Sequence, residues 1–122
     1  MKRKKFMRSM KDAVQGLLFV IRRERNMRFH LVAAVLVLAA SLYFKIDRIE
    51  LFFVLTAVFF VIIAEVFNTA LEKAIDLFTT EYHPLAKIIK DIAAGAVLCS
   101  AVFAVIVAWL VFWDKLWTQI IM

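Results

Sequence analysis

The chain has 122 residues, of which 65% are hydrophobic, and a formal net charge of +6. Its mean hydropathy of +0.86 and its apolar share exceed those of ordinary soluble domains, which need charged surface to stay dispersed. This composition excludes a typical soluble enzyme and predicts one integral membrane domain over residues 1–122. Gly16 and Gly95 are the only glycines and Pro84 is the only proline, so turn signals are few and an all-α fold is expected. Cys99 is the only cysteine, which rules out a disulfide within the chain.

Residues 1–28 form a basic lead that differs from the rest of the chain. Between its lysines and arginines, Val14, Leu17, Leu18 and Ile21 recur at helical spacing and make one apolar face. A basic amphipathic helix of this kind lies on an anionic membrane surface. Nucleic-acid binding is the alternative for a basic arm, but no soluble domain follows to present it. A cleaved signal peptide fits less well, because further apolar segments follow the first one.

Three apolar runs follow the lead. They predict membrane spans at about 29–44, 50–70 and 92–113, long enough, with interfacial residues at their ends, to cross a ~30 Å hydrocarbon core. The second run is expected to continue as a helix to Phe78. The third run ends in aromatic residues that suit the headgroup region of a membrane, namely Trp109, Trp113 and Trp117.

The segment AEVFNTALEKAID ends the second apolar run with a stripe of polar side chains. On a helix that turns by about 100° per residue, Glu65, Asn68, Glu72 and Asp76 share one face, and Thr69 flanks it. A charged side chain at the centre of a membrane helix costs roughly 2.5–3.5 kcal/mol, and less near the interface. A divalent cation would offset that cost, because hard cations prefer carboxylate oxygens.

Two other interpretations of the stripe stay open. The acids can simply emerge into water, most readily Asp76, which has Lys73 nearby. A proton-coupled transporter would also place a glutamate such as Glu65 beside hydrocarbon.

A second polar cluster lies in EYHPLAKIIKD, before the third span. Lys90 can hold a phosphate as a point charge, and Tyr82 and His83 can pack on a nucleotide base. Simpler roles are also open: Lys87 can mark the membrane boundary, Asp91 can be a helix N-cap, and Tyr82 and His83 can sit at the interface.

The basic lead sets the expected orientation. By the positive-inside rule the N-terminus is cytoplasmic. Three spans then place the loop Lys45–Glu50 outside and a longer loop, Lys73–Asp91, inside. The carboxylate stripe consequently faces the cytoplasm, where ATP and magnesium are available. Glu24, the sole acid in RRERN, lies at the same side and can neutralise its neighbours, but sequence spacing alone does not bring it to Glu72.

The chain contains no GxxxxGK[ST] or GxGxxG phosphate loop and no Ser/His/Asp set. However, EVFNTALEKAIDL, EYHPLAKIIKDIAAGAVL and ERNMRFH together resemble the bacterial membrane diacylglycerol kinase/undecaprenol kinase family. The similarity covers nearly the whole chain. The segments ERNMRFH and HPLAK are more similar to the Gram-positive undecaprenol kinases than to the diacylglycerol-specific branch.

The resemblance implies ATP-dependent phosphorylation of a lipid alcohol in the bacterial plasma membrane, with undecaprenol favoured over diacylglycerol. It implies a homotrimer whose active sites combine residues from neighbouring protomers. Glu65 would be the general base and Asn68 its polar partner, while Glu24 and Glu72 would bind Mg²⁺, meeting across a protomer boundary. Lys90 and Asp91 would join the catalytic set. The residues implied to contact the nucleotide are Glu24, Glu72, Glu81, Tyr82, His83, Lys90 and Asp91, together with Lys5 and Asp12 in the lead, where the match weakens.

A non-enzymatic membrane protein, such as a small oligomeric transporter or an assembly subunit, is the rival class. It would use Glu65 for proton or cation coupling and would not need Glu24, Lys90 and Asp91. The lipid-facing residues are interchangeable Leu, Val, Ala and Phe, so the sequence does not name the lipid.

Overall fold

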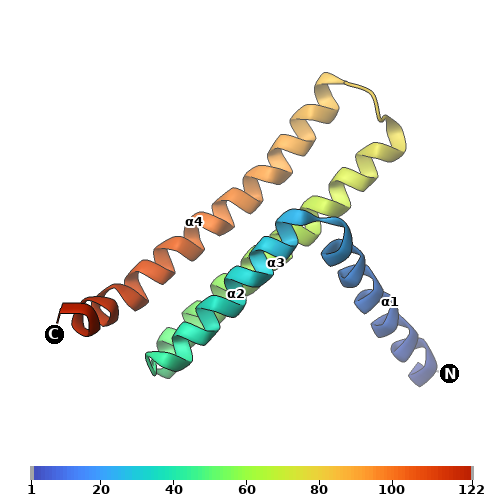
Figure 1. The fold of residues 1–122 in the computed structure, drawn as a ribbon. Helices are drawn as coiled ribbons and strands as arrows, with labels where there is room; N and C mark the ends of the chain where they lie inside the picture. Colours follow the sequence, from blue (N-terminus) through green and yellow to red (C-terminus); the bar gives the residue numbers. More distant parts are fainter. Residues whose placement is uncertain (1, 122) are drawn as a thin grey trace.

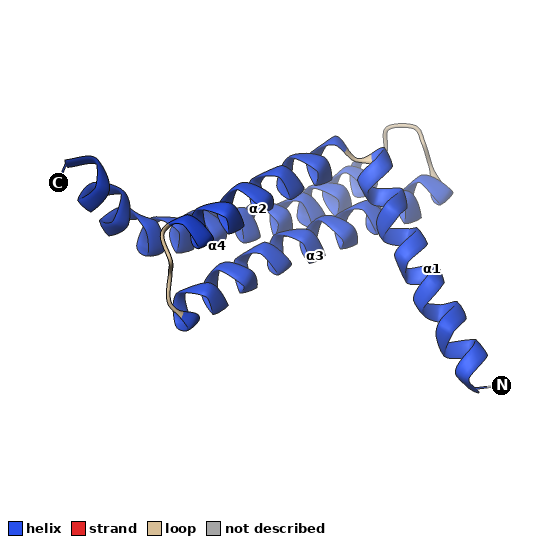
Figure 2. Ribbon diagram, turned by 60° about the horizontal axis from the view of Figure 1, so that its bottom comes forward, coloured by secondary structure: helices blue, strands red, loops and turns tan. Residues whose placement is uncertain are grey.

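A computed structural model of the chain describes residues 2–121. In this range the chain forms four helices and no strand: α1 (Lys2–Arg23), α2 (Arg25–Tyr43), α3 (Arg48–Phe78) and α4 (Pro84–Ile121). The last three run side by side as a bundle, and α1 leaves the bundle obliquely (Figures 1 and 2). The three bundle helices are apolar and long enough to cross a membrane. The predicted all-α architecture, with an N-terminal amphipathic helix and three spanning helices, is confirmed.

The bundle helices differ in length. α2 has 19 residues, or about 28 Å at 1.5 Å per residue, close to a hydrocarbon core of ~30 Å. α3 has 31 residues and α4 has 38, or about 46 and 57 Å, so both extend beyond such a core. Figure 1 shows α3 and α4 continuing past the level of the α1–α2 junction.

The connection between α3 and α4 is shorter than expected. It covers only residues 79–83, so the predicted loop Lys73–Asp91 is wrong over most of its length. No glycine or proline interrupts the chain between Lys73 and Phe78, and Pro84 opens α4, where a missing N–H is tolerated. Asp91 lies inside α4, which excludes its role as an N-cap.

A one-residue break separates α1 from α2. Glu24 is extended, with φ −104° and ψ 115°. The Arg28 Nη1 atom donates hydrogen bonds to the carbonyls of Ile21 at 3.1 Å and Arg22 at 2.8 Å, which supplies partners for the last carbonyls of α1. Val20 before the break and Met27 after it are both buried. The junction is therefore braced, and the predicted lead of residues 1–28 divides at Glu24.

The predicted apolar face of α1 is present on the helix and is exposed over most of its length. Val14, Leu17 and Leu18 are exposed, and Ile21 is half-buried near the junction. The side chains therefore remain available to a membrane surface.

The core of the bundle lies toward the turn between α2 and α3. Its buried members come from α3 and α4, namely Val54, Ala57, Val107, Val111 and Phe112. Apolar side chains of α2 pack around them.

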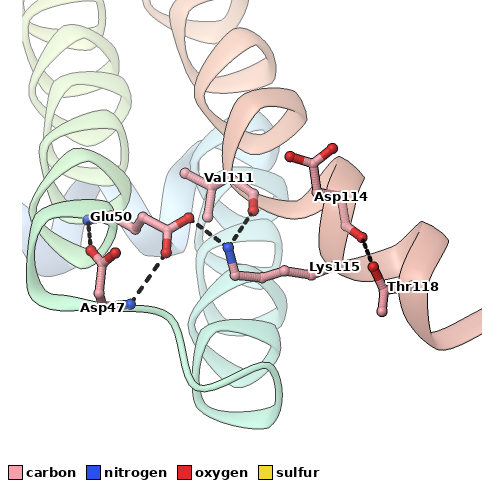
Figure 3. Close-up of polar contacts among 6 residues, drawn as sticks. All are labelled: Asp47, Glu50, Val111, Asp114, Lys115 and Thr118. Atoms are coloured by element: carbon pink, nitrogen blue, oxygen red, sulfur yellow. Dashed lines mark hydrogen bonds and ion pairs between the residues drawn. The ribbon is translucent and has the colours of Figure 1, made fainter.

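Polar contacts connect α3 and α4 at the same end of the bundle (Figure 3). Asp47 and Glu50 form a reciprocal capping box at the start of α3. The Lys115 Nζ atom of α4 lies 2.6 Å from Glu50 Oε2 and donates to the Val111 carbonyl at 2.9 Å. Both charged side chains are largely covered, so the ion pair ties α4 to the beginning of α3.

Breaking this ion pair should destabilise the bundle. Lys115→Met leaves Glu50 without its partner, and we expect a loss of roughly 1–3 kcal/mol of unfolding free energy. The double variant Lys115→Met/Glu50→Gln should lose less, because no charge is then left unpaired. Thermal unfolding in detergent micelles measures both, with exposed Lys45→Met as the control. If the single and double variants lose the same stability, the ion pair does not couple the helices.

Candidate functional site

The polar stripe of α3 forms as predicted, because the helix runs without interruption from Arg48 to Phe78. Glu65 and Asn68 are buried, with 1% and 8% of their surface exposed. Glu72 and Asp76 follow on the same face and are half-buried. The Asn68 Nδ2 atom donates a long hydrogen bond to Glu72 Oε1 at 3.4 Å. The stripe therefore begins inside the bundle and emerges toward the end of α3.

Two atoms of the stripe lack hydrogen-bond partners. Glu65 Oε2 and Asn68 Oδ1 are both buried, and neither is paired within residues 2–121. Buried polar atoms in native proteins nearly always have a partner, and each exception requires an explanation. Thr69, which the sequence placed at the edge of the stripe, does not supply one, because its hydroxyl donates to the Glu65 carbonyl at 3.0 Å. The unpaired oxygens mark a place where a ligand can bind.

His30 of α2 is a site residue that sequence reasoning did not single out. Its Nε2 atom lies 3.8 Å from Glu65 Oε2, and the two side chains are 17% and 2% exposed. A neutral imidazole can donate one N–H, and a modest movement would bring this pair into hydrogen-bond range. The sequence feature that could have indicated His30 is its polar side chain near the start of an apolar helix.

Glu24 lies in the break between α1 and α2, near enough to Glu65 for their charges to interact. No hydrogen bond or ion pair joins the Glu24 side chain to the stripe within residues 2–121. Phe19 of α1 contributes to this placement, because the Lys73 Nζ atom of α3 lies 5.9 Å from the centre of its ring. The expectation that Glu24 and Glu72 bind one Mg²⁺ across a protomer boundary stays a prediction.

Lys90 connects α4 to the outer end of the stripe. Its Nζ atom lies 2.9 Å from Asp76 Oδ1. Asp91, its neighbour, instead pairs with Lys87 one turn away on the exposed face of α4. Of the two α4 residues predicted for the catalytic set, the structure joins only Lys90 to the stripe.

The remaining predicted nucleotide contacts lie on exposed surfaces. Tyr82 is 80% exposed, and His83 Nδ1 accepts the Leu85 backbone N–H at 3.1 Å, so His83 supports the start of α4. No hydrogen bond or ion pair joins these residues to the three acids anywhere in the described range. The same holds for the other exposed candidates, Glu81 in the connection and Lys5 and Asp12 on α1.

The donor set suits a hard cation. Within residues 2–121 no three His, Cys, Asp or Glu side chains are close enough to form a complete metal cage. Magnesium, however, is usually bound by one or two carboxylates together with substrate phosphates. Two carboxylates beside an unpaired buried oxygen therefore fit a magnesium site that the phosphates of a nucleotide complete.

Comparison with known proteins identifies the family. A family model described as prokaryotic diacylglycerol kinase matches residues 11–112. The chain belongs to this family. An undecaprenol kinase from Bacillus subtilis (strain 168) is 38% identical over 112 residues, which are 92% of this chain and 91% of that protein.

Two diacylglycerol kinases are also similar. The enzyme from Synechocystis sp. (strain ATCC 27184 / PCC 6803 / Kazusa) is 40% identical over 81% of this chain and 57% of its own length. The enzyme from Escherichia coli (strain K12) is 31% identical over 68% of each. The protein is thus a multi-pass membrane lipid kinase of this family, and the non-enzymatic alternatives are wrong.

The contact between His30 and Glu65 leads to a testable role. We expect His30→Leu, which keeps the volume but removes the N–H donor, to lower kcat about tenfold. A hydrogen bond from His30 to the Glu65 carboxylate, formed once their 3.8 Å separation closes, would contribute roughly 1.5 kcal/mol. His30→Gln should restore much of the loss, since its amide also donates. Steady-state kinetics with lipid and nucleotide varied separately provide the measurement.

A positioning role for His30 also predicts an unchanged KM for the nucleotide. Adding His30→Leu to a Glu65→Gln variant should have little further effect, because the carboxylate to be positioned is already absent. Equal losses for the leucine and glutamine variants would point to packing alone.

Proposed function

We propose that this protein transfers the γ-phosphoryl group of ATP to the hydroxyl of a membrane lipid alcohol, with undecaprenol as the favoured acceptor. The observation that carries the proposal is the buried, unpaired Glu65 Oε2 atom, which lies beside His30 and within reach of the charges of Glu24 and Glu72. A lipid hydroxyl in contact with this oxygen would give it the hydrogen-bond partner that it lacks.

In the proposed reaction, Glu65 accepts the proton of the lipid hydroxyl as the lipid oxygen bonds to the γ-phosphorus. The bond between the γ-phosphorus and the bridging oxygen breaks, and ADP leaves with that oxygen. Phosphoryl transfer of this kind depends on positioning and charge neutralisation more than on covalent chemistry by the protein. Asn68 would orient the reacting groups through its free carbonyl oxygen.

The surrounding charges would hold the nucleotide. A magnesium ion bound by Glu24 and Glu72 would neutralise phosphate charge, and Lys90 would hold a phosphate if it exchanged its Asp76 partner for the nucleotide. Asp91 and the exposed connection residues Glu81, Tyr82 and His83 would lie toward the base and sugar.

We further propose a homotrimer with its N-terminus and active sites at the cytoplasmic face. Lys5 and Asp12 are far along a helix that leaves the bundle, so a contact with nucleotide from a neighbouring protomer suits them better than one within the chain. The mass of the purified protein, from sedimentation in density-matched detergent, tests the trimer. The accessibility of an introduced N-terminal cysteine in intact cells tests the orientation.

The acceptor is supported by similarity. The undecaprenol kinase from Bacillus subtilis matches over nearly its whole length, which favours undecaprenol. The 40% identity to a diacylglycerol kinase makes diacylglycerol the second candidate.

The deciding experiment uses the purified full chain in mixed micelles with magnesium and ATP. ATP consumption and lipid phosphate formation are followed with undecaprenol, diacylglycerol or ceramide as the only added alcohol. We expect the highest kcat/KM with undecaprenol. Preference for diacylglycerol would reassign the acceptor, and ATP consumption that does not respond to any lipid alcohol would contradict the proposal.

A further inference from the structure

Two positively charged side chains lie near one aromatic ring where α1 meets α3. The Arg23 Cζ atom of α1 lies 5.8 Å from the centre of the Phe19 ring, and the Lys73 Nζ atom of α3 lies 5.9 Å from it. Both distances are within the range of a cation–π interaction. Two positive charges from two different helices are therefore held no farther apart than the sum of these distances.

Neither of these cations forms an ion pair in the part of the chain that the structure describes. The lysines and the histidine that do form ion pairs in residues 2–121 lie elsewhere. The acids next to the two cations in the chain, Glu24 and Glu72, form no ion pair with them. Because like charges held near one ring repel each other, an anion between Arg23 and Lys73 would stabilise the contact of α1 with α3.

The chain around the α1–α2 junction adds further positive charge. Residues 22–28 contain four arginines and one acid. Arg22 and Arg25 are exposed, and Arg28 uses only its Nη1 atom to bond the carbonyls that end α1. A guanidinium group has five N–H donors, so most of those on Arg28 remain available. The junction therefore has the electrostatic character of an anion-binding site.

The junction also lies at the level expected for lipid headgroups. α2 begins at Arg25 and is apolar and long enough to span a membrane, so the residues before it lie at the end of a span. Headgroups occupy the layer just outside the hydrocarbon core, and basic residues at this level attract anionic lipids. Leu18 and Phe19 are 40% and 43% exposed and offer apolar surface beside the cations. An anion that carries a hydrocarbon chain suits these surroundings better than a free ion.

The two cations lie on a different side of α3 from the acidic stripe. On a helix that turns by about 100° per residue, Lys73 lies about 100° from Glu72. Lys90, which we propose to hold a nucleotide phosphate, pairs with Asp76 farther along α3. The site at Phe19 is therefore distinct from the candidate nucleotide site.

We propose that Arg23 and Lys73 bind the phosphate of an anionic membrane lipid, which bridges α1 and α3 beside Phe19. A phosphate group can accept charge-assisted hydrogen bonds from a guanidinium and an ammonium group at the same time. The bound lipid would hold α1 at a fixed angle to the bundle. The inference goes beyond the proposed function, and its test requires no turnover.

Lipid binding can be counted directly on the purified full chain. The protein is delipidated in detergent and titrated with phosphatidylglycerol, which is anionic, or with phosphatidylcholine, which has the same phosphate but no net charge, and bound lipids are counted by native mass spectrometry. We expect the first phosphatidylglycerol per chain to bind about tenfold more tightly than phosphatidylcholine. Inorganic phosphate and ATP, each in excess, should not displace it.

A matched pair of double variants separates a discrete site from general attraction to the basic helix. Arg23→Gln/Lys73→Gln removes the proposed site, whereas Arg8→Gln/Lys11→Gln removes the same charges from exposed positions on α1 away from the junction. We expect the Kd for phosphatidylglycerol to rise about tenfold in the first variant and by less than about twofold in the second. Circular dichroism checks that each variant keeps its helices.

The single variants test whether both cations hold the same phosphate. If they do, removing Lys73 after Arg23 should weaken binding less than removing Lys73 from the parent protein. Independent effects of the two substitutions would overturn the bridge between α1 and α3.

The other outcomes also decide the proposal. Equal weakening by the two double variants, or equal affinity for the two lipids, would show that no discrete anionic-lipid site exists at Phe19. Displacement of the lipid by inorganic phosphate would identify a general phosphate site, and displacement by ATP alone would assign Arg23 and Lys73 to the nucleotide site. Either displacement would overturn the assignment to a lipid.

Discussion

Replacing Glu65 with glutamine should lower turnover by roughly 10²–10⁴-fold, the range contributed by a general base. The two side chains have nearly the same shape, so the fold and the binding of MgATP should survive, but an amide cannot accept the proton of the lipid hydroxyl. The site offers no substitute, because the other nearby acids, Glu24 and Glu72, are proposed to bind metal. The measurement is the initial rate of lipid phosphorylation at saturating substrates, with nucleotide affinity determined separately.

Asp114→Asn is the matched control for this variant. Asp114 is an exposed acid near the opposite end of the bundle, and the same conversion of a carboxylate to an amide there should leave the rate unchanged. A Glu65→Gln enzyme that works at the parental rate would remove the base assignment. Loss of nucleotide affinity together with turnover would instead indicate that Glu65 binds metal.

Removing a proposed magnesium ligand should change the dependence of activity on the metal. In Glu72→Ala or Glu24→Ala, one hard oxygen donor is lost, and we expect the magnesium concentration for half-maximal activity to rise by at least about tenfold. The affinity for MgATP should fall as well, because the ion would bridge the protein and the phosphates. Magnesium titrations of lipid phosphorylation at fixed free ATP provide the measurement.

Asp114→Ala serves as the comparison, since Asp114 is an exposed acid near the opposite end of the bundle with no proposed role in binding metal or nucleotide. High magnesium should partly rescue the Glu72 and Glu24 variants but should not rescue Glu65→Gln, which lacks the base. If both metal-site variants titrate like the parent enzyme, Glu24 and Glu72 hold the structure together and bind no metal. If high magnesium rescued Glu65→Gln, Glu65 would be a metal ligand, and the base would have to be Glu24 or Glu72.

The helical architecture could be predicted because its causes are local. Hydrophobic runs, the scarcity of glycine and proline, and the absence of any interruption from Arg48 to Phe78 each act through neighbouring residues. The same locality explains why the register of Glu65, Asn68, Glu72 and Asp76 was predicted correctly. Residues three or four positions apart share one face of a helix, whatever that helix packs against.

Features that depend on contacts between helices could not be predicted. The turn at the single extended residue Glu24 and the capping of α1 by Arg28 leave no distinctive pattern in sequence, so the position of Glu24 relative to α3 could not be predicted. In the sequence His30 is one polar residue near the start of an apolar helix, and only the packing of α2 against α3 brings it near Glu65. Charged residues do not mark the ends of the loop between α3 and α4, because charge is compatible with helix outside the hydrocarbon core, and the loop is therefore shorter than the sequence predicts.

A single extended residue, Glu24, joins the helix α1 to the bundle, so a small rotation at this junction displaces the far end of α1. α1 has 22 residues and is therefore about 33 Å long, so a rotation of about 10° at the junction moves its free end by about 6 Å. The hydrogen bonds of Arg28 and the buried side chains of Val20 and Met27 hold the junction in place. The N-terminal end of α1 makes no such contact with the described bundle. Side chains near the junction, such as Phe19, are held in place by their contacts with the bundle. Lys5 and Asp12, which lie toward the tip, are positioned only as accurately as the bilayer surface or a neighbouring molecule supports them.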